Sequence, residues 1–436
     1  MTMLSEILLV GVAFLALLLS GLWIPFAIAI VATIYLYVNF GYAGLRAFGL
    51  VSWGSMNNFT LTAIPLFIFM AELMLQSGLS RRVYRGLSRL VRRLPGGLLQ
   101  TNIAGCAVFA SISGSSVATA AAIGTVALPQ LEERRYDRRM STGTLAAGGT
   151  LGILIPPSIA MIIYGSFTET SIAKLFMAGV VPGLLLTGLF MLYVGVRAIV
   201  QPQVAPREHL TMGPREWLET VTDLVPFAVL IVLVMGGLYL GFVTPTEAAA
   251  LGCCSAVVVC AIWGDMNRAL FQKALQNTVR VSGAILFIVY AAFLFSYAVG
   301  MAGLGDKLTG ALVGLELDRL SFLIAIFVLY TILGCVLDSI GMMVITVPLL
   351  YPILLGYGID PLWFGVVLVL LIELGQITPP LGLNLFVIQS ISSGKLSDVV
   401  LGTVPFYLLI FVMLGLLVAV PELALWLPSQ MSARGL

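Results

Sequence analysis

Two pairs of adjacent prolines lie in otherwise apolar stretches, and each pair follows a glycine by four positions. Gly152 precedes the pair at 156–157, and Gly375 precedes the pair at 379–380. Because proline removes an amide donor and clashes with the carbonyl one turn back, both stretches are expected to unwind inside a helix. Unwound backbone offers carbonyl oxygens, which are hard ligands suited to sodium, whereas half-helix amino ends attract anions.

Two polar clusters complement these breaks. One is Ser-Ile-Ser-Gly-Ser-Ser at 111–116, and the other is Asp338, which Ser339 and Gly341 follow. A carboxylate inside a membrane is costly and is usually functional. We therefore predict one ion site where serines 113–116 meet the break at 150–157. A second is predicted where Asp338 meets the break at 375–384, with substrate bound between the two.

The elements that position these residues are expected to be membrane helices. Of the 436 residues, 60% are hydrophobic and only 10% are charged, with a mean hydropathy of +1.08, whereas soluble domains carry about 25% charged residues. A crossing helix needs about 20 apolar residues. On that basis, spans are predicted near 4–22, 23–41, 60–79, 141–165, 174–198, 222–243, 248–264, 281–301, 361–390 and 399–424.

The segments 98–131 and 320–356 do not fit simple crossings. Seventeen of the 22 basic residues fall in loops assigned to one side, which the positive-inside rule makes cytoplasmic. Both flanks of 98–131 are arginine-rich, so this segment must enter and leave by the same face. It is too short for two full crossings, and it is predicted to be a re-entrant hairpin with its tip at 111–116. The segment 320–356 has flanks poor in basic residues and is predicted to enter from the opposite face.

The two halves of the chain repeat one another. The proline pairs are offset by 223 positions, and Gly78 to Ser113 spans the same 35 positions as Gly303 to Asp338. Each half contains a span, a hairpin and a broken span, which indicates an inverted repeat of the kind found in secondary transporters. The predicted fold is a single all-α membrane domain over 1–436. Its repeats cover about 50–200 (hairpin 98–131, broken helix 141–165) and 222–424 (hairpin 320–356, broken helix 361–390).

Several other features point away from catalysis. His209 is the one histidine, and the five cysteines show no metal-site spacing, so an intramembrane enzyme is disfavoured. Glu72 and Glu373 are weaker functional candidates than Asp338. Residues 264–280 interleave apolar and basic side chains, which predicts a helix lying on the cytoplasmic surface.

The chain resembles the large subunit of TRAP (tripartite ATP-independent periplasmic) transporters over nearly its whole length. Five motifs carry the resemblance in family order: Phe-Ala-Ser-Ile-Ser-Gly-Ser-Ser-Val-Ala-Thr at 109–119, Gly-Ile-Leu-Ile-Pro-Pro-Ser at 152–158, Leu-Phe-Met-Ala-Gly-Val-Val-Pro-Gly at 175–183, Thr-Pro-Thr-Glu-Ala-Ala at 244–249 and the stretch 375–384. The resemblance implies an elevator mechanism, in which a core holding both hairpins and both broken helices slides against a scaffold.

The resemblance also implies site residues. One sodium ion is expected at Ser113 and Ser115 with carbonyls of Gly152, Ile155 and Pro157. A second is expected at Asp338 with Gly375, Thr378 and Pro380. Substrate contacts are expected from Ser116, Thr119, Pro156, Pro379 and Asn384. No cofactor is expected beyond sodium as the coupling ion.

The expected function is sodium-coupled import of a small organic acid across the bacterial inner membrane. The resemblance implies two partners, namely a small membrane subunit, here expected as a separate chain, and a periplasmic substrate-binding protein. A related dicarboxylate elevator carrier that works without a binding protein is the first alternative. A channel or a structural membrane subunit is the second, and an intramembrane enzyme is the third.

Overall fold

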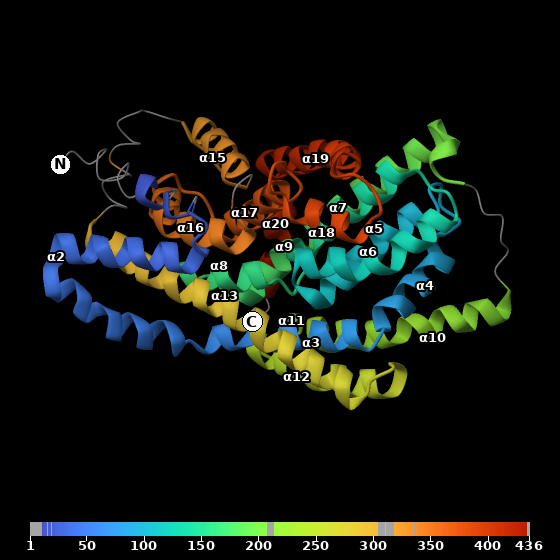
Figure 1. The fold of residues 1–436 in the computed structure, drawn as a ribbon, viewed down its shortest axis with the longest axis horizontal. Helices are drawn as coiled ribbons and strands as arrows, with labels where there is room; N and C mark the ends of the chain where they lie inside the picture. The colour runs from blue at the N-terminus through green and yellow to red at the C-terminus, as the bar shows by residue number, and fades with distance from the viewer. Residues whose placement is uncertain are drawn as a thin grey trace.

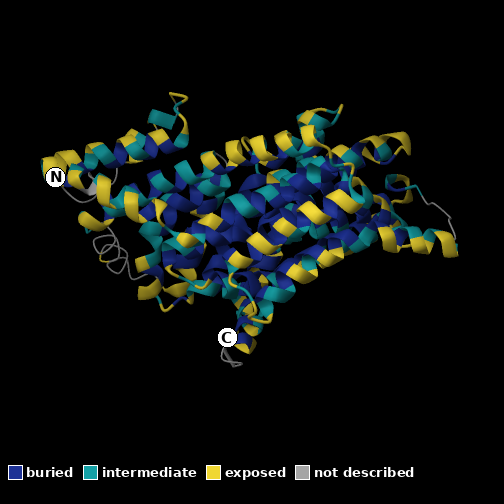
Figure 2. Ribbon diagram, turned by 90° about the horizontal axis from the view of Figure 1, so that it is seen from below, coloured by how far each residue is buried: buried dark blue, intermediate teal, exposed yellow. Residues whose placement is uncertain are grey.

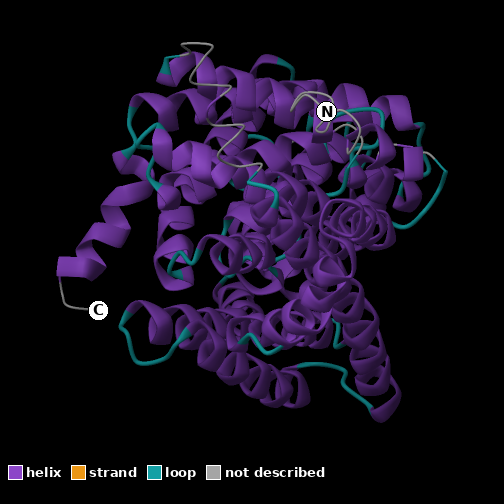
Figure 3. Cartoon of the chain, turned by 90° about the vertical axis from the view of Figure 1, so that its left-hand side faces the viewer, coloured by secondary structure: helices purple, strands orange, loops and turns teal. Residues whose placement is uncertain are grey.

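The structure is a computed structural model that describes residues 11–14, 16–18, 20–206, 213–303, 310, 318–334 and 337–433. Within these ranges the regular structure is entirely helical (Figure 3). Nine helices or helix pairs of the described chain are long and apolar enough to cross a membrane. Part of the predicted first span (residues 4–10, 15 and 19), together with His209 and Cys335, lies outside the described residues.

One group of helices forms the lower edge of the molecule in Figure 1. It contains α2, which bends at Gly41, where φ is 59°, and the long α13 that packs along α2. Many of its side chains are exposed and apolar, as expected of helices that face lipid. The members are α2 (Ile24–Met56), α3 (Ala63–Gln76, after the short helix Phe59–Thr62), α4 (Leu79–Val91), α10 (Pro214–Ile231, continued by Val232–Gly236 and by α11, Gly237–Tyr239), α12 (Pro245–Trp263) and α13 (Arg268–Met301).

The first predicted hairpin is present as α5 (Leu98–Ser113) and α6 (Ser116–Glu133), which pack against each other. The helix that follows is interrupted where the first proline pair predicts. It consists of α7 (Arg138–Leu154) and α8 (Ile159–Thr168). Both arms of the hairpin pack on α7.

The second half contains the same succession of elements. The second hairpin is α15 (Arg319–Gly334) and α16 (Ser339–Gly356), and the second interrupted helix is α17 (Pro361–Gln376) and α18 (Leu383–Ile391). An all-helical membrane fold with two hairpins and two interrupted helices is therefore confirmed. The division into repeats at 50–200 and 222–424 stays a prediction.

The interrupted helices occupy the centre of the molecule, where burial is greatest (Figure 2). All of α17 from Trp363 to Gln376 is buried. The most apolar window of the α7–α8 segment is 94% buried, whereas the other candidate spans are 33–56% buried. Small residues permit this packing, since the backbones of α7 and α19 meet at Gly143 and Gly402. Unwound backbone at the first break is thus held within protein rather than facing lipid.

Three further helices enclose this centre. They are α9 (Ile172–Val200), α19 (Leu396–Ala419) and α20 (Glu422–Ala433). The last predicted span, 399–424, has the wrong carboxyl-terminal limit. Helix α19 ends at Ala419, Val420 is not helical, and α20 begins as a separate element.

The prediction of a separate surface helix at 264–280 is also wrong. Asn267 caps α13 by accepting the Leu270 amide (2.9 Å), and one helix of 34 residues then runs from Arg268 to Met301. Its amphipathic first part continues directly into the predicted span at 281–301. The alternating apolar residues describe one face of this long helix, because no glycine or proline separates the two parts.

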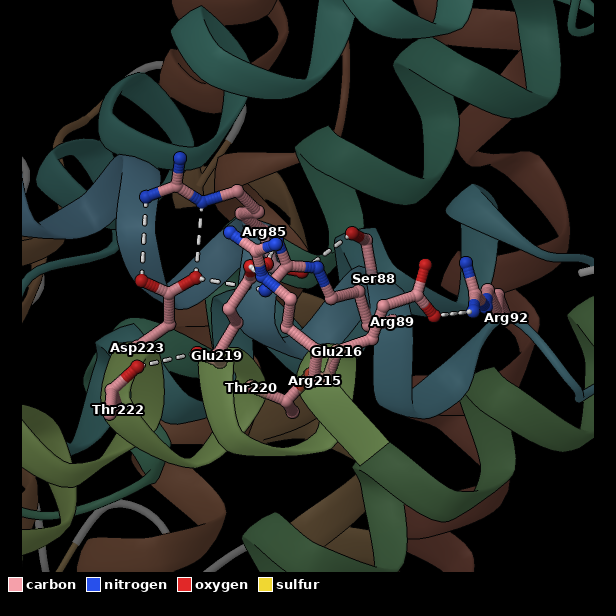
Figure 4. A network of polar contacts seen from close by, with 10 residues as sticks. All are labelled: Arg85, Ser88, Arg89, Arg92, Arg215, Glu216, Glu219, Thr220, Thr222 and Asp223. Carbon is pink, nitrogen blue, oxygen red and sulfur yellow. Dashed lines mark hydrogen bonds and ion pairs between the residues drawn. The ribbon is translucent and has the colours of Figure 1, made fainter. Parts of the chain in front are cut away.

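A set of ion pairs joins α4 to α10 (Figure 4). Arg85 donates through Nε (3.1 Å) and one terminal nitrogen (3.4 Å) to Asp223. Arg89 contacts Asp223 (3.4 Å) and Glu219 (2.9 Å), and Arg92 donates to Glu216 (2.9 Å). The arginines that predict a cytoplasmic loop therefore also attach α4 to α10.

We expect Asp223→Asn to lower the thermal midpoint of the detergent-solubilised protein by a few degrees. The Asp223 side chain is only 8% exposed and forms ion pairs with Arg85 and Arg89. The Arg85 side chain is 55% exposed, so water can replace part of the lost stabilisation. The remaining loss is about 1 kcal/mol. Glu219→Gln is the matched control, because its 46% exposed carboxylate should contribute much less. Equal shifts in the two variants would show that Asp223 is no stronger an attachment than Glu219.

Candidate functional site

The tip of the first hairpin has a backbone that its sequence dictates. Helix α5 ends at Ser113, and Gly114 then adopts the left-handed conformation (φ 61°), which favours glycine. Ser115 is extended, and its hydroxyl caps α6 by accepting the Ala118 amide (3.4 Å). The turn is therefore tight, and it places the amino end of α6 beside the carboxyl end of α5.

The first helix break follows from missing amides. Pro156 and Pro157 provide no N–H, so the carbonyls of Gly152 and Ile153 lose their usual donors one turn on. The Ser158 hydroxyl replaces one of them by donating to Ile153 (2.6 Å), and it also caps α8. The bond between the two prolines is cis. Pro156 cannot donate a hydrogen bond to the Gly152 carbonyl oxygen. This oxygen is therefore available to coordinate an ion, as the predicted site requires.

The hairpin tip and this break are in direct contact. The Ile159 amide donates to the Gly114 carbonyl (3.2 Å). A Cβ atom built on Gly114 would lie 2.9 Å from the Pro157 carbonyl oxygen, and one built on Gly152 would lie 2.5 Å from the Ser115 carbonyl oxygen. Four of the residues predicted for the first ion site, Ser113, Ser115, Gly152 and Pro157, thus belong to one small region.

Two other predicted residues take different positions. The Thr119 hydroxyl, expected to contact substrate, lies 2.6 Å from the Ser113 hydroxyl and donates to the Ser115 carbonyl (2.8 Å). It therefore sits among the oxygens predicted for the first ion site. Ile155 ends α7, and its side chain packs towards α9 at Gly183. Pro156 is buried in the same break.

The second hairpin meets the second break through two glycines and a glutamine. Helices α15 and α17 touch at Gly334 and Gly375, where a Cβ on Gly375 would lie 2.7 Å from the Gly334 Cα. The Gln376 side chain donates to the Ser339 hydroxyl. Asp338 precedes Ser339 at the amino end of α16 without capping it, and its buried Oδ1 has no hydrogen-bond partner among the described residues.

The second break is built differently from the first. The Thr378 amide donates to the Gly375 carbonyl (3.2 Å), and the Gly382 amide donates to the Thr378 carbonyl (3.0 Å), which forms a compact turn. Pro379 and Pro380, joined by a cis bond, are exposed, whereas the first proline pair is buried. The second site is therefore the more open of the two in this structure.

A chain of side chains links the two halves between these breaks. The Ser116 hydroxyl lies within hydrogen-bonding reach of the carboxamide oxygens of Gln376 and Asn384, at 2.9 Å from the latter. Asn384 also donates to the Ala146 carbonyl (3.1 Å). With the Gln376 contact to Ser339, both hairpin tips and both interrupted helices are connected. Sequence reasoning proposed Ser116 and Asn384 as contact residues, gave no role to Gln376, and named Ser339 only as a member of the Asp338 cluster. A glutamine in an apolar helix beside Gly375 was the available signal.

We expect Ser116→Ala to weaken this link. The change removes a hydroxyl whose single proton is donated to one of the buried Gln376 and Asn384 oxygens at a time, and it leaves that oxygen without this donor, at a cost of about 1–3 kcal/mol. A lower thermal midpoint and slower uptake by the reconstituted transporter should both be measurable. Ser111→Ala is the control, because the Ser111 hydroxyl donates only to the Val108 carbonyl of its own helix (2.7 Å). If Ser116→Ala and Ser111→Ala had the same thermal midpoint and the same rate of uptake, the contacts of the Ser116 hydroxyl would be unimportant.

The two weaker candidates differ in their surroundings. Glu72 accepts from Asn277 of α13 (3.1 Å) and from Gln76 (3.3 Å), so it joins α3 to α13. Glu373 is completely buried, and neither carboxylate oxygen has a hydrogen-bond partner among the described residues. It lies near Thr150 of α7, its counterpart in the sequence repeat.

Most of the atoms that could coordinate an ion at this site are neutral oxygens. Hydroxyls and backbone carbonyls surround the first break, and Asp338 adds one carboxylate at the second. The described residues contain no group of three or more histidine, cysteine, aspartate or glutamate side chains placed to hold a metal ion. Neutral hard oxygens in this arrangement fit an alkali cation better than a divalent transition metal.

Comparison with known proteins shows which family the chain resembles. A family model described as "Tripartite ATP-independent periplasmic transporter, DctM component" matches residues 11–423. The C4-dicarboxylate TRAP transporter large permease protein DctM of Pseudomonas aeruginosa is 34% identical over 387 residues, covering 88% of this chain and 90% of that protein. The sialic acid TRAP transporter large permease protein SiaM of Vibrio cholerae is 29% identical, covering 97% and 98%.

Two further similarities concern the architecture. The isethionate TRAP transporter permease protein DctMQ of Oleidesulfovibrio alaskensis is 34% identical over 85% of this chain, which covers 59% of that longer protein. The YdaH transporter of Alcanivorax borkumensis has the same overall fold, with a TM-score of 0.62 at 16% identity over 93% of this chain and 96% of that one. The chain belongs to the DctM family, the large permease subunits of tripartite ATP-independent periplasmic (TRAP) transporters.

Proposed function

We propose that this chain imports a small organic acid together with sodium ions, as the permease subunit of a TRAP transporter in the bacterial inner membrane. The observation that carries the proposal is the convergence of both hairpin tips with both interrupted helices along Ser116, Gln376 and Ser339. Such a convergence at the repeat interface is where secondary transporters bind substrate and coupling ions.

The sodium sites follow the two breaks. The first uses the serine hydroxyls and the Ser115, Gly152, Ile155 and Pro157 carbonyls. The second uses Asp338 with Gly375, Thr378 and Pro380. A sodium ion would give the Asp338 Oδ1 atom, which has no hydrogen-bond partner among the described residues, the positive neighbour that a carboxylate in an apolar setting requires.

The substrate is proposed to be a small carboxylate held between these sites by Ser116, Pro156, Pro379 and Asn384. The amino ends of α6 and α18 lie at the hairpin tip and after the second break, and helix amino ends favour anions. Relatives at similar identity are named for C4-dicarboxylates, isethionate and sialic acid. All three are organic acids, but isethionate is a sulfonate, so these names support an organic anion and the carboxylate class rests on the other two.

Two partners complete the proposed transporter. A periplasmic binding protein delivers the acid, and a small membrane subunit supports the permease. The exposed apolar surfaces of α2, α10, α12 and α13 suit a scaffold. The hairpins and interrupted helices would move against it as an elevator.

Sodium supplies the driving force in this proposal. Each net positive charge that enters at 100 mV contributes about 2.3 kcal/mol. An excess of sodium charge over substrate charge therefore drives accumulation, and dissipating either the sodium gradient or the potential should slow uptake.

Uptake into proteoliposomes tests the proposal. Radiolabelled organic acid should enter only when the permease, the small subunit, the binding protein and an inward sodium gradient are all present. Replacing sodium by potassium should abolish uptake. Full uptake by this chain alone would instead identify a stand-alone carrier, and uptake without sodium would overturn the proposed coupling.

A further inference from the structure

A cavity on the arginine-rich side of the molecule has no role in the proposed transport site. Its volume is about 790 Å³, and it lies where the α4–α5 connection meets the ends of α6 and α9. Five arginines line it: Arg85, Arg89, Arg92, Arg93 and Arg134. The described residues lining it include no aspartate or glutamate. We call this cavity the basic pocket.

The positive charge of the basic pocket is only partly balanced. The carboxylates of α10 engage Arg85, Arg89 and Arg92 from outside the lining (Figure 4). Arg93, the next residue along, is exposed and makes no ion pair with a described residue. Arg93 therefore keeps a positive charge at the basic pocket that a bound anion would neutralise.

One buried donor points to a ligand independently. The Arg92 side chain is only 12% exposed, and its Nε–H has no hydrogen-bond acceptor among the described residues, although its terminal nitrogen donates to Glu216. A buried unsatisfied donor is costly, particularly on a charged group. An oxygen-rich anion in the basic pocket would supply the missing acceptor.

The neighbouring backbone favours the same ligand. Gly96, Gly97 and Leu98 line the basic pocket at the amino end of α5. The Leu98 amide donates to the Tyr136 hydroxyl (3.3 Å), so the dipole of this 16-residue helix, rather than a free amide, attracts negative charge there. Arginine forks combined with a helix amino end suit the oxygens of a phosphate group.

The rim indicates where the phosphate comes from. Leu94 and Ile199 both line the basic pocket and are 47% and 59% exposed, and they lie among the basic residues assigned to the cytoplasmic interface. Exposed apolar side chains beside arginines suit acyl chains below an anionic headgroup, and basic pockets between membrane helices bind such headgroups. A soluble phosphate would make no use of this rim.

We propose that the basic pocket binds the phosphate headgroup of an anionic phospholipid. The lipid would sit where α4 meets the first hairpin and α9, and it would satisfy Arg92 and Arg93 together. This site is separate from the sodium and substrate residues, so it stands whether or not the proposed coupling is correct.

Hydrogen exchange of the full-length protein in nanodiscs tests the proposal. Amides of residues 92–98 should exchange more slowly in phosphatidylglycerol nanodiscs than in phosphatidylcholine nanodiscs. In native mass spectrometry, the ratio of bound phosphatidylglycerol to bound phosphatidylcholine should fall about fivefold in Arg93→Gln. Arg81→Gln removes the same charge from the start of α4, outside the basic pocket, and should leave both readouts unchanged.

Three outcomes would overturn the proposal. The first is no difference between the two lipids in the wild type. The second is an equal loss of the difference in Arg81→Gln and Arg93→Gln, which would indicate general surface attraction. The third is protection of 92–98 by inorganic phosphate in phosphatidylcholine nanodiscs, which would assign the basic pocket to a soluble phosphate.

Discussion

Asp338→Asn is expected to reduce sodium-dependent uptake at least about tenfold in proteoliposomes that contain the complete transporter. The buried Oδ1 of Asp338 has no hydrogen-bond partner among the described residues, and the residue stands at the hairpin tip beside Ser339, which contacts Gln376 at the end of α17. Asparagine keeps the shape but removes the charge. Losing a charged contact of about 1.5–3 kcal/mol corresponds to a tenfold change or more in ion affinity.

The sodium dependence of the rate separates an ion-site role from a structural one. In Asp338→Asn, the sodium concentration for half-maximal uptake should rise, while insertion and thermal midpoint stay close to those of the wild type. Asp360→Asn is the matched control, because Asp360 is exposed and caps α17 by accepting the amides of Leu362 (2.8 Å) and Trp363 (3.1 Å). Asparagine caps helices equally well. An unaltered sodium response in Asp338→Asn would remove this residue from the ion site.

Gly152→Ala is expected to abolish most uptake and to lower the thermal midpoint. The added methyl would lie 2.5 Å from the Ser115 carbonyl oxygen and 2.6 Å from the Thr119 hydroxyl. That carbonyl is fixed, because it accepts both the amide (3.0 Å) and the hydroxyl (2.8 Å) of Thr119. The hairpin tip must therefore move away from α7, and overpacking of this kind costs about 1–3 kcal/mol.

Gly188→Ala provides the comparison for this change. Gly188 is an exposed residue of α9, and nothing lies within 4 Å of a Cβ atom built on it. Uptake and midpoint should both match the wild type, since the same methyl is added to a helix without crowding it. If Gly152→Ala transported normally, the close contact of α7 with the hairpin tip would have no part in the ion site.

Local backbone chemistry explains why so much was predictable. The prolines at 156–157 and 379–380 remove amides that a continuous helix needs, and Gly114 permits the turn at the hairpin tip. Each effect involves a few adjacent residues, so the sequence alone located both hairpins and both interruptions. The arginine distribution then gave a prediction of their orientation.

Helix limits were less predictable where no such residue intervenes. Residues 264–280 have the pattern of a surface helix, yet they form the beginning of the 34-residue α13. An amphipathic pattern describes which face of a helix is polar, and it does not say whether the helix ends.

The sequence by itself determined the class of protein, the order of its elements and the residues of the two breaks. Only the tertiary structure decided that Gln376 joins Ser116 to Ser339, that the first proline pair is buried while the second is exposed, and that five arginines surround one cavity. The physical reason is distance along the chain. Ser116 and Gln376 are 260 positions apart, so their contact depends on how whole helices pack, whereas a break in a helix depends on the residues beside it.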